Sequence, residues 1–263
     1  MDPVVVGYLR EQADTLRGQE EAVRTDVPDS IHQARVAVRK IRSALRVFAA
    51  DEPGAGPLDD RLREWGRTLG RARDAEVVRE LLRTRARMLR ADDGRTRAAR
   101  ELADRLDRQL AREYEGARTA VLDVLGTPEH TALLAELDRF AVPTEEEASH
   151  LVAAARGARK TFRKRERKAG RLSGPDADRA WHRARRAAKR ARYAAELVRD
   201  AVPGKPARTY RDHARRLRKA QSRLGARQDE VALRGWLARQ RSRARDDGED
   251  LTPYDVLLHP DTA

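Results

Sequence analysis

The sequence pattern of this 263-residue chain is helical almost throughout, which leaves few fold classes open. Alanine, leucine, arginine and glutamate dominate, and all four favour helices. Alternating β-branched runs bounded by turns are absent. Clusters of proline, glycine, aspartate and serine divide the chain into helical segments; they lie at 26–30, 51–57, 92–94, 126–128, 142–144, 173–176 and 202–206. The sequence therefore predicts an all-α fold.

An internal repeat divides the chain into two similar parts. Residues 31–42 match residues 181–192, and residues 62–77 match residues 217–231. Two blocks in the same order predict two similar helical halves related by a pseudo-two-fold axis. We place the first half at 1–140, the second half at 141–250 and the C-terminal tail at 251–263. The tail carries two more prolines, so we expect an irregular segment that is folded back on the body or frayed.

The charge balance points to a polyanionic partner. Lysine and arginine total 57 against 43 acidic residues, which gives a formal net charge of +14. Such a surplus is typical of proteins that bind nucleic acid, a membrane surface or a phosphate polymer. A surplus spread evenly over the surface would not indicate a polyanionic partner. The placement of the basic residues on the helices therefore decides whether the surplus indicates one.

The absence of cysteine excludes disulfides and cysteine-based metal sites. The longest stretch without a charged residue, 148–155, is far shorter than the ~20 apolar residues that a membrane helix needs. The N-terminus, Met1-Asp2-Pro3, has an acid where a signal peptide has a base. We expect a soluble cytoplasmic protein with no membrane partner.

The predicted helix over 31–48 carries an apolar stripe and, beside it, a basic row. The stripe is spaced by three and four residues, as a core-facing stripe is, and comprises Ile31, Ala34, Val38, Ile41, Leu45 and Phe48. The row has the same spacing and comprises His32, Arg35, Arg39, Arg42 and Arg46. At 100° per residue the row covers an arc of about 80°, centred about 100° from the stripe. These bases therefore border the core.

The second copy repeats both features. Its apolar stripe comprises Trp181, Ala184, Ala188, Ala191, Ala195 and Val198. Its basic row comprises His182, Arg185, Lys189 and Arg192, and ends at Glu196 in place of Arg46. Like charges at this spacing repel, and the simplest reason to keep both rows is an anion that neutralises them. The planar guanidinium of arginine binds phosphate bidentately. A row of bases that rises along the helix axis suits an extended polymer better than a single phosphate. The alternative is a solvated face salt-bridged to acids of a neighbouring helix.

These residues resemble the paired signatures of the CHAD family, the conserved histidine α-helical domains. The resemblance covers residues 3–259 and includes the Leu-Gly blocks that lead to Asp74 and Asp229. It implies two pseudo-symmetric helical bundles packed around a central basic cavity that binds inorganic polyphosphate. It also implies that the cavity is lined by His32, Arg35, Arg39, Arg42, His182, Arg185, Lys189 and Arg192.

Two positions depart from strict equivalence of the halves: Gln228 stands opposite Arg73, and Glu196 stands opposite Arg46. Family members often carry a triphosphate-tunnel domain with an ExExK strand. The sequence has no such motif, so we expect the domain to stand alone.

Further bases are expected to complete the lining. Arg46 ends the first row, and the helices before the Leu-Gly blocks add Arg63, Arg67 and Arg218. The run 159–165 cycles around its helix and is mostly a solvated face, with Arg163 the member expected to point inward. For Asp74 and Asp229 we favour helix capping, where one helix gives way to the next after Gly70 and Gly225, over the orientation of a basic side chain or histidine by a hydrogen bond.

The sequence favours binding without chemistry, and predicts no cofactor and no metal. Phosphoryl chemistry needs converging carboxylates or an activated nucleophile. The one run of three acids, 145–147, cannot converge on a metal, and neither a phosphate-binding GxxxxGK[ST] loop nor a paired-histidine spacing occurs. The expected partner is inorganic polyphosphate, with polyphosphate granules implied by the resemblance. The alternative is a nonspecific nucleic-acid binder, against which stand missing recognition motifs and an aromatic content of only 4%.

Overall fold

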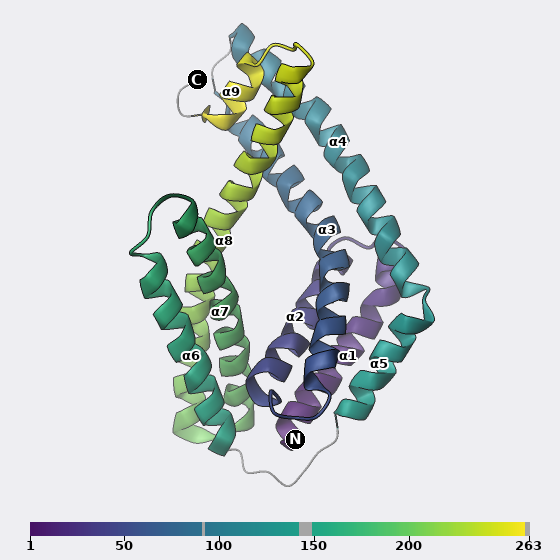
Figure 1. Ribbon diagram of the computed structural model, residues 1–263, viewed down its shortest axis with the longest axis vertical. Coiled ribbons are helices and arrows are strands. Elements are labelled where there is room, and N and C mark those ends of the chain that lie inside the picture. Colours follow the sequence, from purple (N-terminus) through teal and green to yellow (C-terminus); the bar gives the residue numbers. More distant parts are fainter. Residues whose placement is uncertain (91–92, 142–148, 261–263) are drawn as a thin grey trace. The chain divides into compact units, whose positions relative to one another are not determined.

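The computed structural model describes residues 1–90, 93–141 and 149–260. Within these residues the regular structure is helical, with no strand, which confirms the predicted fold class (Figure 1). The helices are α1 (Pro3–Arg24), α2 (Ser30–Phe48), α3 (Ala55–Met88), α4 (Gly94–Leu125), α5 (Pro128–Phe140), α6 (Ser149–Ala169), α7 (Gly174–Ala201), α8 (Gly204–Asp246) and α9 (Thr252–Leu258). None of these helices combines the length and apolar character that crossing a bilayer requires.

The predicted helix breaks coincide with helix ends, apart from 142–144 and residue 92, which lie outside the described residues. Local chemistry explains two of the starts. The Asp2 carboxylate accepts a hydrogen bond from the Val4 amide at 2.7 Å, and the Thr127 hydroxyl accepts one from the His130 amide at 3.2 Å. Both caps are followed by proline, which fits the first turn because its missing N–H would have no helical partner.

The C-terminal tail is not irregular as predicted, because residues 252–258 form α9. Pro253 lies in the first turn of this helix, where proline is tolerated. Tyr254, Val256 and Leu257 are buried, and this burial stabilises a helix too short to persist alone. The prediction treated proline as a helix breaker at a position where it starts one.

The capping role favoured for Asp74 and Asp229 is also wrong. Asp74 lies inside α3 and Asp229 inside α8, and both helices continue unbroken through Gly70 and Gly225. A residue in a helix interior has no terminal amides to cap. Tertiary packing outweighs the weak helix propensity of glycine at these two positions.

The chain forms two compact units, and each predicted half contributes to both. Unit 1 comprises Met1–Leu69 and Ala120–Gly225; unit 2 comprises Gly70–Thr119 and Ala226–Ala263. The divisions within α3 and α8 fall at the repeated Leu-Gly blocks. The arrangement as pseudo-symmetric halves over 1–140 and 141–250 stays a prediction.

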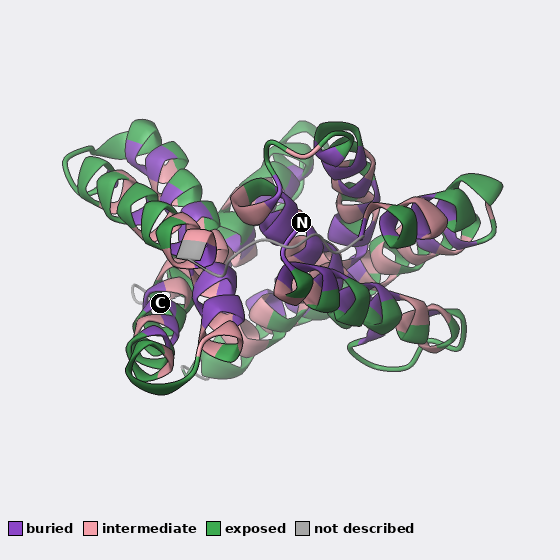
Figure 2. Cartoon of the chain, turned by 90° about the horizontal axis from the view of Figure 1, so that it is seen from below, coloured by how far each residue is buried: buried purple, intermediate pink, exposed green. Residues whose placement is uncertain are grey.

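Unit 1 is built on two pairs of neighbouring helices that meet through α2 and α7. Helix α1 packs along α2, and α6 packs along α7 (Figure 1). The predicted apolar stripes are confirmed as buried, except that Phe48 and Trp181 are half-buried. Figure 2, seen from below, shows buried residues gathered on some faces of the helices and exposed residues on others.

Helix α3 approaches α2 closely at a glycine. A Cβ atom built on Gly66 would lie 3.3 Å from Val38 Cγ1, tighter than most real contacts. The missing side chain at Gly66 therefore lets the first turns of α3 lie against the α2 stripe. This contact also brings Asp59, on the same part of α3, towards the basic row of α2.

Unit 2 has its own leucine-rich core. Leu82, Leu110, Leu237 and Leu257 are almost completely buried and come from α3, α4, α8 and α9. Several arginines of unit 2 lie in ion pairs, such as the contact of 2.9 Å between Arg79 Nε and an Asp107 carboxylate oxygen.

The alanine stripe of α7 predicts a sharp difference between two alanine-to-leucine changes. Ala184 is fully buried, so Ala184→Leu should overpack the core and cost about 1–3 kcal/mol of unfolding free energy. Ala153→Leu, on the exposed face of α6, should cost close to nothing because both residues favour helices. Urea unfolding followed by circular dichroism measures both. Equal midpoints for the two variants would contradict the packing described for α7.

Candidate anion-binding site

The contact between α2 and α7 brings arginines of both basic rows together within unit 1. Arg39 of α2 is half-buried at this contact. Burial lowers the pKa of the Arg39 guanidinium, and the nearby guanidiniums of Arg35, Arg185 and Arg192 lower it further, against the opposing effect of Tyr193. Arginine remains charged at neutral pH despite such a shift. Arg39 is therefore a cation held partly away from water among other cations.

No carboxylate compensates Arg39 in the part of the chain that the structure describes. Its Nε atom is sealed from solvent and has no hydrogen-bond partner there. Buried polar groups are nearly always satisfied, and the exceptions call for an explanation such as a bound ion or water. A buried charge without a counter-charge is more costly still. We call the group formed by Arg35, Arg39, Arg185, Arg192 and Tyr193 the α2–α7 site.

On the α7 side, Arg192 and Tyr193 also have buried polar atoms without hydrogen-bond partners among the described residues, although Arg192 has a carboxylate nearby. The Arg192 Cζ atom lies 4.6 Å from the centroid of the Tyr193 ring, and Arg192 Nη1 lies 3.8 Å from a Glu196 carboxylate oxygen. Within the described residues, the Arg192 Nε atom and the buried Tyr193 hydroxyl have no hydrogen-bond partner. An oxyanion between the two helices would find guanidinium and hydroxyl donors together.

The C-terminal end of the α2 row is instead partly neutralised inside the protein. Arg42 Nε lies 2.9 Å from one oxygen of the buried Asp59 carboxylate, and Arg46 Nη2 lies 2.6 Å from the other. Burial alone would raise the pKa of Asp59, but the hydrogen bonds from Arg46 and Arg42 outweigh it and lower the pKa overall. At this end of the row the arginines pair with an acid of a neighbouring helix, as the alternative interpretation of the basic row predicted.

The structure places the predicted site residues in two burial groups. Half-buried are His32, Arg35, Arg39, Arg42, Arg63, Arg185, Lys189 and Arg192; exposed are Arg46, Arg67, Arg163, His182 and Arg218. Of these, the α2–α7 site brings together Arg35, Arg39, Arg185 and Arg192. Their role as ligands to a polyanion stays a prediction.

Three of the added residues have neighbours that were not expected. Arg63 pairs with Asp60 at 3.0 Å, and Arg218 pairs with Glu196 at 3.3 Å. Arg163 is exposed, and together with Arg159 it lies near His213, whose Nε2 is 2.8 Å from Arg159 Nη1. Burial and these arginines lower the pKa of His213. The expectation that Arg163 points into a central cavity stays a prediction.

Sequence reasoning missed Arg190. It is half-buried on α7, and the guanidiniums of Arg165 and Arg186 are among its neighbours. The predicted basic row follows one face of the helix, and Arg190 lies outside that row, one residue or about 100° away from Lys189. The only sequence signal was its place in the basic run 189–192 of the second repeat.

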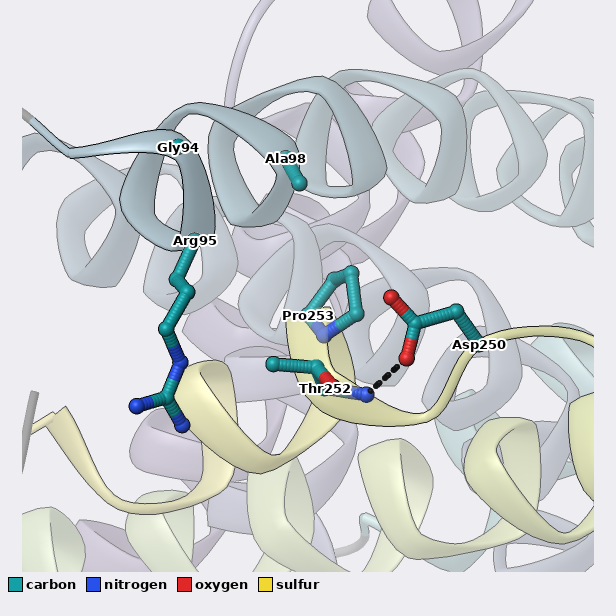
Figure 3. Close-up of a pocket in the computed structure, with 6 residues that line it drawn as sticks. All are labelled: Gly94, Arg95, Ala98, Asp250, Thr252 and Pro253. Carbon is teal, nitrogen blue, oxygen red and sulfur yellow. Dashed lines mark hydrogen bonds between the residues drawn. The ribbon is translucent and has the colours of Figure 1, made fainter.

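A pocket in unit 2 lacks the converging cations of the α2–α7 site. It has a volume of about 480 Å³, and Arg95 is the one basic residue among those that line it (Figure 3). The Asp250 carboxylate in its wall accepts a hydrogen bond from the Thr252 amide at 2.9 Å. Across the described residues no group of three histidine, aspartate or glutamate side chains is placed to hold a metal ion. The acidic run 145–147 lies outside those residues.

Comparison with known proteins identifies the class to which this helical fold belongs. The CHAD domain model matches residues 7–238, so the chain belongs to the CHAD domain family. The crystal structure of the CHAD domain from the plant Ricinus communis superposes with a TM-score of 0.74 at 26% identity, covering 98% of this chain and 87% of that one. PptA from Streptomyces chartreusis has a TM-score of 0.76 at 21% identity, covering 98% and 92%, which shows a shared fold.

Among curated proteins, an uncharacterized protein of Mycobacterium tuberculosis, known from two strains, is 33% identical over 261 residues. The match covers 95% of this chain and 48% of that protein. The chain therefore spans about half the length of the curated relatives it matches.

The pairing at Asp59 predicts a defined pH dependence of stability. Because the folded-state pKa of Asp59 is depressed, its contribution is present above its ordinary pKa and is lost as the pH falls through the folded-state value. Asp59→Asn should lower the unfolding free energy at neutral pH by about 2 kcal/mol, since hydrogen bonds to charged groups are lost. The difference from wild type should narrow as the pH falls from about 5 to about 2.

Asp60→Asn is the matched control, because Asp60 is the exposed neighbour of Asp59 and pairs with Arg63 at the surface. Its effect should stay within a few tenths of a kcal/mol at every pH. Denaturant unfolding across the pH range measures both variants. A deficit for Asp59→Asn that does not change with pH would show that the carboxylate charge is not what stabilises this contact.

Proposed function

We propose that this CHAD domain binds inorganic polyphosphate at the α2–α7 site without catalysing a reaction. The proposal includes a cytoplasmic location and association with polyphosphate granules. Membership of the CHAD family supports it, since the sequence resemblance implied the same ligand class.

The observation that carries the proposal is the half-buried Arg39 guanidinium, which has no ion-pair partner among the described residues and lies near three other arginines. Cations held this close repel, and the repulsion is stronger away from water. A phosphate oxygen placed among them would offset both the repulsion and the lost hydration. Arginine donors match phosphate in geometry as well as charge.

The length of the α2 row favours a polymer over a single phosphate. From Arg35 to Arg46 the row covers eleven residues, or about 16 Å along the helix axis. Asp59 neutralises the end with Arg42 and Arg46 only in part, since one carboxylate serves two guanidiniums. A chain of linked phosphates could lie along several of these charges, and each contact would release counterions.

The test removes two charges from the α2–α7 site. The double variant Arg39→Gln/Arg192→Gln should weaken binding of long-chain polyphosphate by about 10- to 100-fold, since two charge-assisted contacts are lost. It should also lower the slope of log affinity against log salt by about two. Arg97→Gln/Arg112→Gln, two exposed arginines of α4, removes the same charge and should change affinity by less than about 3-fold.

Fluorescence anisotropy at several salt concentrations measures the affinities, and circular dichroism checks that both variants fold. Equal losses in the two double variants would mean that net charge, and not the α2–α7 site, drives binding. Double-stranded DNA that competes as well as polyphosphate at matched phosphate concentration would favour nucleic-acid binding instead. Shortening of the polymer during incubation would contradict a purely binding role.

A further inference from the structure

A second group of arginines lies on another face of α7, within unit 1. Arg190 is half-buried there, one turn after Arg186. Burial lowers the pKa of the Arg190 guanidinium, and the charges of Arg165 on α6 and of Arg46 and Arg42 on α2 lower it further, together with Arg186. Three helices therefore place cations near Arg190, as two helices do near Arg39.

The space beside Arg190 is a pocket that is partly open to solvent. A pocket of about 280 Å³ lies among α2, α6 and α7, with Arg46, Arg190 and Thr161 as its polar lining. Alanine and valine side chains form the rest of its wall. One water occupies about 30 Å³ of liquid, so the pocket has room for a phosphate group and several waters. We call it the Arg190 pocket.

The carboxylates near this pocket do not balance its charge. Asp59 accepts hydrogen bonds from Nε and Nη2 of both Arg42 and Arg46. Within the described part of the chain, Nη1 of these two arginines makes no hydrogen bond, and Arg190 has neither a hydrogen bond nor an ion pair. One carboxylate thus faces several guanidiniums that retain unused donors.

We propose that the Arg190 pocket is a second phosphate-binding site, separate from the α2–α7 site, which takes a terminal phosphate or a short phosphate oligomer. Arg190 and Arg46 hold the phosphate oxygens, and the Thr161 hydroxyl donates a further hydrogen bond. The proposal rests on the proposed function in that both sites take the same class of ligand. It predicts that this domain binds phosphate at two sites, each of which can be disrupted without the other.

Both sites draw on the same row of α2. Arg39 belongs to the first site and Arg46 to the second, seven residues or about 10 Å further along the helix. Tripolyphosphate should therefore fill the two sites independently. A long polymer should lose affinity when either site is damaged.

Isothermal titration with tripolyphosphate tests this directly. Wild type should bind two equivalents per chain, and Arg190→Gln and Arg39→Gln should each bind one. Arg183→Gln is the matched control, an exposed arginine of the same helix, and should keep two equivalents. Each single loss should lower the affinity for long-chain polyphosphate about 5- to 20-fold, as expected for one charge-assisted contact.

A second variant fills the Arg190 pocket with a carboxylate side chain of the protein itself. Ala158→Glu places a carboxylate in the pocket wall, where it should pair with Arg190 or Arg46, abolish one tripolyphosphate site and raise the melting temperature. Ala153→Glu, on the exposed face of α6, should do neither. The melting temperatures also show whether each variant folds.

Different results would contradict the proposed function and the proposal of a second site. If wild type binds one equivalent that Arg39→Gln removes and Arg190→Gln leaves intact, the Arg190 pocket is not a phosphate site but the proposed function stands. If Arg39→Gln and Arg183→Gln both bind like wild type, the α2–α7 site is not the polyphosphate site and the proposed function fails.

Discussion

Burial of the apolar stripes on α2 and α7 holds the like-charged guanidiniums of unit 1 close together despite their mutual repulsion. Buried stripes on α2 and α7 fix the two helices, and the small alanine side chains of α7 allow close packing. Packing of these stripes in the core fixes the positions of the basic residues beside them. Hydrophobic burial, which gains about 25 cal/mol per Å² of apolar surface, therefore offsets the electrostatic cost of the site.

The two arginine-rich regions of unit 1 differ in the counter-charge that the protein supplies. Near Asp59 an internal carboxylate takes up Arg42 and Arg46, so the protein itself supplies part of the counter-charge. At Arg39 no described carboxylate does so. A site that lacks its own counter-ion is destabilising when empty and stabilised when filled, so ligand binding and stability are linked. The two regions therefore differ in how much counter-charge the protein itself supplies: a part of it near Asp59, and none from a described carboxylate at Arg39.

Sequence patterns predicted what depends on helical periodicity and failed where tertiary partners decide. The stripes and the half-buried position of Arg39 follow from spacing alone. The pairing with Asp59 depends on a close approach of α3 at Gly66, which no local pattern reveals. Arg190 was missed because its neighbours come from three helices, and Asp74 was misread because a glycine does not end a helix that packing sustains.

The central claim is that Arg39 is kept at a cost to stability because it binds an anion, and the melting temperature of Arg39→Met with and without long-chain polyphosphate tests it most directly. Methionine keeps an apolar stem and removes the charge. Without ligand the variant should melt higher than wild type, since a repelled and partly buried cation is gone. With saturating polyphosphate the order should reverse, because wild type gains more from binding. A variant that melts lower than wild type without ligand, and whose melting temperature polyphosphate raises by the same amount, would contradict the account.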